Sequence, residues 1–165
     1  MARQRSSLPA PAIFEYLVPG RPVSAQPRSN NRERKDPRLP RWRREINTAI
    51  EQAIEERAGL RRYQLHIDPM RIQIVWFTDS PSDAQTPDLD NIAKPFLDGL
   101  IGLIITEDRL FHEVHLRKVE LNHQFEPEPD LVFDAKARSL TEFVYVRVEP
   151  LEWDLPTRLG RVARR

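Results

Sequence analysis

The chain of 165 residues contains no cysteine, which excludes disulfide bonds, cysteine-based zinc sites and thiol nucleophiles. It has only 5 glycines, too few and too widely spaced for a phosphate-binding loop. No apolar run approaches the ~20 residues that a membrane-spanning helix needs. The first residues, MARQRSSLPAPAIF, lack the apolar core of a signal peptide. We therefore expect a cytoplasmic protein without membrane contact and, at this length, a single folded domain.

The net charge is close to zero, at a formal +1, but the two signs are segregated along the chain. Residues 1–44 carry 11 Lys and Arg against 3 acids, and residues 158–165 add four Arg. Residues 78–108 carry 7 acids against one base, Lys94. Basic arms around an acidic centre suit a metal-dependent enzyme that acts on a polyanion. Charge blocks of this kind are also typical of solvated faces, and composition alone leaves both interpretations open.

Hydrophobic patterning predicts an α+β fold in the order β-α-β-α-β-β, with one mixed sheet and two main helices packed on it. One apolar stripe predicts a helix over 41–58, and a second helix is expected to begin near 90–92 and to stop at Gly102. Alternating apolar residues predict strands over 13–18, 70–78, 113–121 and 142–149. Residues 1–12 are expected to be a disordered basic N-terminus, 13–150 the single folded domain, and 151–165 an arginine-rich tail. The aromatic residues on the apolar stripes, which we assign to the core, are Trp42, Trp76 and Phe96.

The most informative stretch is PDLDNIAK at 87–94, with Asp108 following eighteen residues after Asp90. In an extended segment Asp88 and Asp90 point the same way, and two adjacent carboxylates repel each other unless a cation lies between them. Hard oxygen ligands with open coordination positions suit Mg²⁺. We expect the following helix to turn the chain back, so that Asp108 returns to the start of that helix.

The same residues also have a purely structural explanation. Asp90 or Asn91 would cap the helix, and Lys94 would pair with Asp98 one turn further along. Capping is compatible with a metal site, and it leaves Asp88 and Asp108 without a role.

The chain resembles the RusA family of Holliday-junction resolvases in three features that follow one another along the sequence. They are the motif DLDNxxK, an apolar helix containing LDGL, and ED at 107–108. The resemblance covers about residues 13–150, including a first strand that runs into PGxP and a basic loop. It implies a RusA-like endonuclease domain that acts as a homodimer on four-way DNA junctions. It further implies Mg²⁺ as the cofactor, with Mn²⁺ as a substitute and no nucleotide cofactor, and paired symmetric nicks during DNA recombination and repair.

The resemblance also assigns roles to residues. It implies that Asp88, Asp90 and Asp108 are catalytic acids that bind the metal, that Lys94 is the catalytic base-side or charge-stabilising lysine, and that Asn91 positions DNA or braces the site. The Pro- and Asn-rich basic loop suits phosphate contacts, and the expected DNA-binding residues are Arg21, Arg28, Arg32, Arg34, Lys35 and Asn91.

Two features depart from the family pattern. Pro87 stands where some relatives have Arg, and the 122–140 loop and the arginine-rich tail look like additions. Two other functions stay open: a junction-binding protein with weak or no catalysis, and a metal-dependent nuclease that acts on forks, flaps or RNA.

Overall fold

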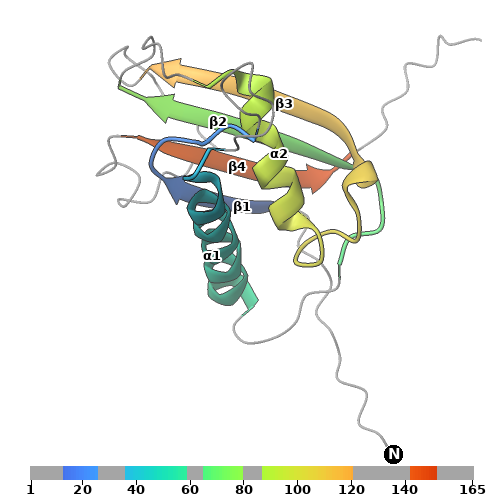
Figure 1. Ribbon diagram of the computed structural model, residues 1–165. Helices are drawn as coiled ribbons and strands as arrows, with labels where there is room; N and C mark the ends of the chain where they lie inside the picture. The colour runs from blue at the N-terminus through green and yellow to red at the C-terminus, as the bar shows by residue number, and fades with distance from the viewer. Residues whose placement is uncertain (1–12, 26–35, 59–64, 80–86, 121–141, 152–165) are drawn as a thin grey trace, which may run out of the picture.

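The computed structural model describes residues 13–25, 36–58, 65–79, 87–120 and 142–151. Four strands form one sheet, and two helices lie on one of its faces (Figure 1). The elements follow in the order β1 (Phe14–Pro19), α1 (Leu39–Ala58), β2 (Met70–Thr78), α2 (Leu89–Leu100), the 3₁₀ helix η1 (Asp108–Leu110), β3 (Phe111–Glu120) and β4 (Phe143–Pro150). The predicted α+β domain, with its order β-α-β-α-β-β, is confirmed.

The sheet is mixed and has the strand order β1-β4-β2-β3. β4 pairs antiparallel with both β1 and β2, whereas β2 and β3 pair in parallel. Thr78 is therefore opposite Glu120 at one end of the sheet, and Met70 is opposite Phe111 at the other end. The chain that follows β2 and the chain that precedes β3 lie at opposite ends of the sheet.

The core lies between the helices and the sheet, where every second strand residue points towards α1 and α2. Ile72, Ile74 and Trp76 of β2 are fully buried there. Trp42 of α1 packs edge-on against Phe96 of α2, with their ring centroids 6.0 Å apart. The assignment of these aromatic residues to the core is confirmed. Among the described residues, no helix is long and apolar enough to cross a membrane.

The predicted bounds differ from the observed ones mainly at α2. This helix begins at Leu89, so Pro95 lies in its second turn, whereas we expected it in the first turn. A proline has no N–H, and the carbonyl four residues earlier therefore loses its helical donor. That carbonyl belongs to Asn91, and it accepts a hydrogen bond from the Ala25 N–H at 3.0 Å instead. Gly102, with φ 78°, takes the left-handed conformation just beyond the helix end.

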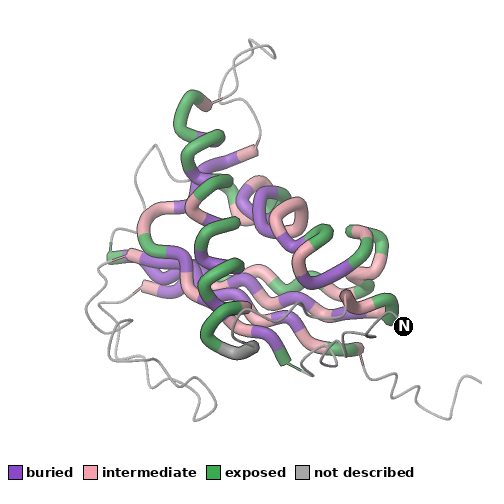
Figure 2. The backbone as a smooth tube through the Cα atoms, turned by 90° about the horizontal axis from the view of Figure 1, so that it is seen from below, coloured by how far each residue is buried: buried purple, intermediate pink, exposed green. Residues whose placement is uncertain are grey.

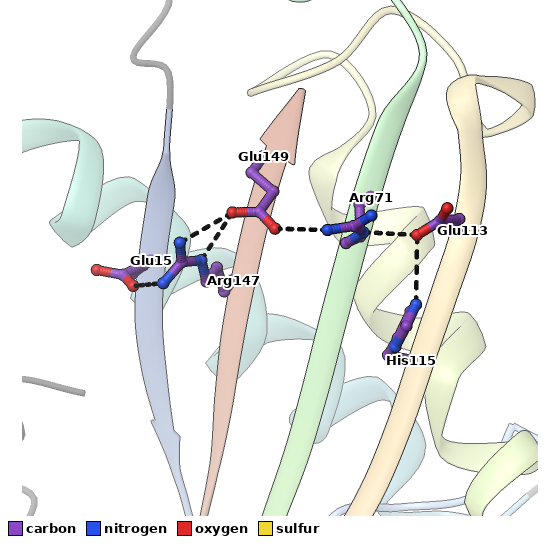
Figure 3. Close-up of polar contacts among 6 residues, drawn as sticks. All are labelled: Glu15, Arg71, Glu113, His115, Arg147 and Glu149. Carbon is purple, nitrogen blue, oxygen red and sulfur yellow. Dashed lines mark hydrogen bonds and ion pairs between the residues drawn. The ribbon is translucent and has the colours of Figure 1, made fainter. Parts of the chain in front are cut away.

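The opposite face of the sheet is not covered by any helix of the described residues (Figure 2). At one end of this face Phe77 stacks on Phe143 with ring centroids 4.7 Å apart. At the other end a row of alternating charges crosses all four strands (Figure 3), formed by Glu15, Arg147, Glu149, Arg71, Glu113 and His115. The Arg71 guanidinium lowers the pKa of Glu113 below its usual value. Because acids and bases compensate each other along this row, the described residues at this end of the face do not form an electropositive surface for DNA.

Candidate active site at the start of helix α2

Asp88 and Asp90 lie at the N-terminal end of α2. Asp88 is the N-cap residue, with an extended backbone (φ −66°, ψ 145°), and Asp90 is in the first helical turn. The expectation that both lie on one extended segment is wrong, because the helix begins between them at Leu89. The alternative in which Asp90 or Asn91 occupies the cap position fails for the same reason. Both carboxylates are exposed, and the Asp88 side chain makes no capping hydrogen bond.

Asn91 connects this helix start to the chain that follows β1. Its N–H donates to the Asp88 carbonyl at 3.1 Å, and its own carbonyl accepts from the Ala25 N–H at 3.0 Å. Its side-chain Oδ1 is buried and has no hydrogen-bond partner among the described residues. The partial positive charge of the α2 N-terminus makes this end of the helix a favourable place for carboxylates or a phosphate.

Lys94 lies one turn beyond Asp90 and is exposed. Its Nζ lies 3.1 Å from Asp98 Oδ1, and the other oxygen of Asp98 lies 3.3 Å from Arg43 Nη2 of α1. The ion pair that the structural explanation expected is therefore present. The Lys94 side chain is nonetheless 64% exposed, and exposed pairs of this spacing contribute only about 0.3–0.5 kcal/mol. The ammonium group can leave Asp98 at little cost.

Asp108 lies apart from the other two acids. It is the first residue of η1, directly before β3, at the end of the sheet where β2 begins (Figure 1). The chain does not return Asp108 to the start of α2, because α2 runs back along the sheet and the turn after it leads into η1. Within the residues that the structure describes, no three His, Asp or Glu side chains come close enough together to hold a metal ion.

The donor chemistry of Asp88 and Asp90 fits a hard divalent cation. Both offer exposed carboxylate oxygens, and neither carboxylate has a hydrogen bond or ion pair with another described residue. Mg²⁺ is commonly held by one or two carboxylates together with water and substrate phosphates. Among the described residues, one chain places these two carboxylates at the start of α2, whereas Asp108, the third carboxylate predicted for the same site, lies in η1.

Of the expected DNA-binding residues, Arg21 and Asn91 are described and the others lie outside the described residues: Arg28, Arg32, Arg34 and Lys35. Arg21 forms an ion pair with Glu142, in which its Nε lies 3.0 Å from Oε1. Sequence reasoning missed Glu142, because nothing local marks a contact between residues 121 positions apart. The contact between Ala25 and Asn91 could have been predicted from Pro95, since a proline inside a helix leaves one carbonyl free for another donor.

Comparison with known protein families yields a match that contains the whole site. The model of the family described as endodeoxyribonuclease RusA matches residues 19–125, well over half of the chain. The matched segment runs from the end of β1 past β3 and includes Asp88, Asp90, Lys94 and Asp108. No curated protein matches the chain.

Proposed function

Because the chain belongs to the RusA family of endodeoxyribonucleases, which resolve Holliday junctions, we propose that it does so by two symmetric nicks that require Mg²⁺. The observation that carries this proposal is the family match over the segment with the DLDNxxK motif. The two motif aspartates lie exposed at a helix N-terminus, which favours a site that binds a cation and a phosphate together.

In this proposal each part of the site has a chemical task. Asp88 and Asp90 would hold the metal, which when bound supplies an activated water and neutralises developing charge on the phosphate. The α2 N-terminus attracts the scissile phosphate through its partial positive charge. Lys94 leaves Asp98 and stabilises the charge on the phosphate or the leaving oxygen.

A test of this function compares DNA substrates. The purified protein is incubated with labelled four-way junctions, forks, flaps, linear duplexes and a junction-sized RNA, each with and without Mg²⁺. We expect cleavage of the junction alone, and only with the metal. Binding without cleavage would favour the junction-binding alternative, and preferential cutting of forks, flaps or RNA would favour a nuclease with another target.

The distance of Asp108 from the motif leads us to propose that the active site is shared between two protomers. A two-fold axis that crosses the middle of α2 brings the N-terminal end of one α2 to the C-terminal end of the other. The partner subunit's Asp108 would then complete the Asp88 and Asp90 pair. A homodimer of this kind has two sites, as matched cuts across a two-fold symmetric junction require.

Complementation between two inactive variants tests the shared site. Asp90→Asn and Asp108→Asn are each expected to be inactive as homodimers. In a mixed dimer, a shared site predicts one intact centre, built from Asp88 and Asp90 of one protomer and Asp108 of the other, and therefore recovery of single-strand nicking. If each protomer uses its own Asp108, every site carries one substitution and the mixture stays inactive. Glu55→Gln, which removes an exposed charge on α1, is the control and should cut like the wild type.

A further inference from the structure

Glu142, directly before β4, connects the core to the chain that follows β1 through hydrogen bonds. Its carboxylate accepts hydrogen bonds from Trp76 Nε1 at 3.1 Å and from Arg21 Nε, which lies 3.0 Å from one oxygen and 3.2 Å from the other. Its carbonyl accepts from the Gly20 N–H at 2.8 Å. Trp76 is fully buried, so the indole holds Glu142 against the rigid centre of the sheet.

Residues 20–25, which we call the strap, run from Glu142 to the start of α2. Gly20 begins the strap with φ 96°, a left-handed conformation that favours glycine. Val23 and Ser24 are buried in its middle. Its end is tied to Asn91 by the Ala25 N–H, which uses the carbonyl that Pro95 leaves free. The strap is thus fixed at one end by Glu142 and at the other by the residue next to Asp90.

We propose that Glu142 is a positioning residue for DNA binding: through Arg21 it holds the strap against the start of α2, beside Asp88 and Asp90. This inference rests on the proposed function. It also changes the role that we expected for Arg21, whose guanidinium acts as an anchor and not as a phosphate contact. Arg28, Arg32 and Arg34, which lie outside the described residues, keep the phosphate-binding role that the sequence predicts.

The two roles considered for Arg21 predict opposite changes in DNA affinity when the charge of Glu142 is removed. If Arg21 binds a phosphate directly, Glu142 competes with DNA for the guanidinium, and removing the charge of Glu142 strengthens binding. If Glu142 positions the strap, removing its charge weakens binding, even though the change makes the protein more positive. Simple electrostatic attraction to DNA therefore predicts the opposite of the positioning role.

The chain provides a matched control in Glu149. Its side chain is 16% exposed, the same as that of Glu142, and it also accepts from arginines, Arg71 and Arg147. It lies near the end of β4, whereas Glu142 directly precedes the start of this strand. Its side chain belongs to the row of charges on the sheet face that no described helix covers (Figure 3). Glu149→Gln therefore reports the general cost of removing a half-buried carboxylate from an arginine pair.

The experiment measures junction affinity over a salt series for the wild type, Glu142→Gln, Glu142→Ala and Glu149→Gln. We expect affinity to fall about 10-fold in Glu142→Gln, further in Glu142→Ala, where no oxygen remains for Arg21 or Trp76, and not at all in Glu149→Gln. Arg21→Gln should cause a similar loss, and the double variant with Glu142→Gln should fall no further than either single one. Hydrogen exchange on the free protein should show faster exchange of the Gly20 and Ala25 amides in both Glu142 variants.

The possible outcomes separate this inference from the proposed function. Unchanged or tighter junction binding by the Glu142 variants would overturn the positioning role while leaving the nuclease activity intact. An equal loss in Glu149→Gln would reduce the role of Glu142 to general stability and would overturn the inference too. A wild-type protein that neither binds nor cuts junctions would overturn the proposed function, and the positioning role for DNA with it. Unchanged amide exchange would overturn the strap itself, whatever the DNA result.

Discussion

Gly99 lies where α1 and α2 cross, and Gly99→Ala tests how tightly these helices hold the motif. A Cβ at this position would lie 3.0 Å from Ile46 Cγ2, 3.1 Å from Asn47 Oδ1 and 3.4 Å from Ile50 Cδ1. Ordinary carbon contacts are about 3.5–4.0 Å. Ile46 and Ile50 are fully buried, so neither side chain can move out into solvent to relieve the contact.

Two effects of opposite sign determine the result of this substitution. Replacing glycine by alanine inside a helix stabilises it by about 0.8–1.0 kcal/mol. Overpacking a filled core costs about 1–3 kcal/mol. We expect the second effect to be larger, with a net destabilisation of about 1 kcal/mol and a melting temperature lower by about 2–4 °C.

The assay is thermal unfolding in two backgrounds. In Ile46→Ala, which removes the 3.0 Å contact with Cγ2, the same Gly99→Ala change should become stabilising, because the remaining short contact is to the exposed side chain of Asn47, which can turn away into solvent. The variant pair thus measures coupling between the two positions. A higher melting temperature for Gly99→Ala in the wild-type background, or the same sign in both backgrounds, would refute the close packing of α1 on α2.

Three further predictions concern the site and the pH dependence of stability. Asp90→Asn should lower junction cleavage by more than about 100-fold, since even outer-shell partners of a metal are worth 10–100-fold. It should leave binding in a gel shift unchanged or tighter, so weaker binding would contradict a metal role. Replacing Arg28, Arg32 and Arg34 together by Ala should weaken binding to all DNA forms and flatten its salt dependence by about 0.9 for each phosphate that the loop no longer binds; an unchanged slope would rule out this loop as a phosphate clamp. Burial raises the pKa of Tyr145 above its usual value, so its contribution to stability is present below about pH 10 and is lost as the pH rises further. Thermal melts should therefore show a smaller loss above pH 10 in Tyr145→Phe, and equal losses would show that this phenol is not the cause.

The elements of this fold were predictable where one pattern dominates a whole segment. The alternation in MRIQIVWFT predicts a strand over 70–78, and β2 spans Met70–Thr78. The apolar stripe predicts a helix over 41–58, and α1 ends at Ala58 but begins earlier, at Leu39. The start of α2 was less predictable. A proline beyond the first turn leaves the carbonyl four residues earlier, here that of Asn91, without a donor from its own helix, so we expected Pro95 in the first turn. A backbone N–H from residue 25 meets that need instead.

The assembly of the site depended on contacts that sequence patterns do not contain. The DLDNxxK motif predicted the family correctly, because the spacing of these residue types is specific. It did not reveal that Asp108 lies at the far end of α2, because this depends on the parallel pairing of β2 with β3. Nor did it reveal that Glu142 accepts from Arg21, since tertiary packing alone brings the two residues together.

The measurement that tests the central claim most directly follows both nicks on a single four-way junction. The junction carries a different label on each of two opposing strands, and wild-type protein is mixed with an excess of Asp90→Asn protomers. A homodimer with one active site for each strand predicts symmetric paired nicks from the wild type alone. In the mixture it predicts junctions that are nicked on one strand and rarely resolved. A wild-type protein that resolves junctions while light scattering shows a monomer, or mixed dimers that still make both cuts, would contradict the account.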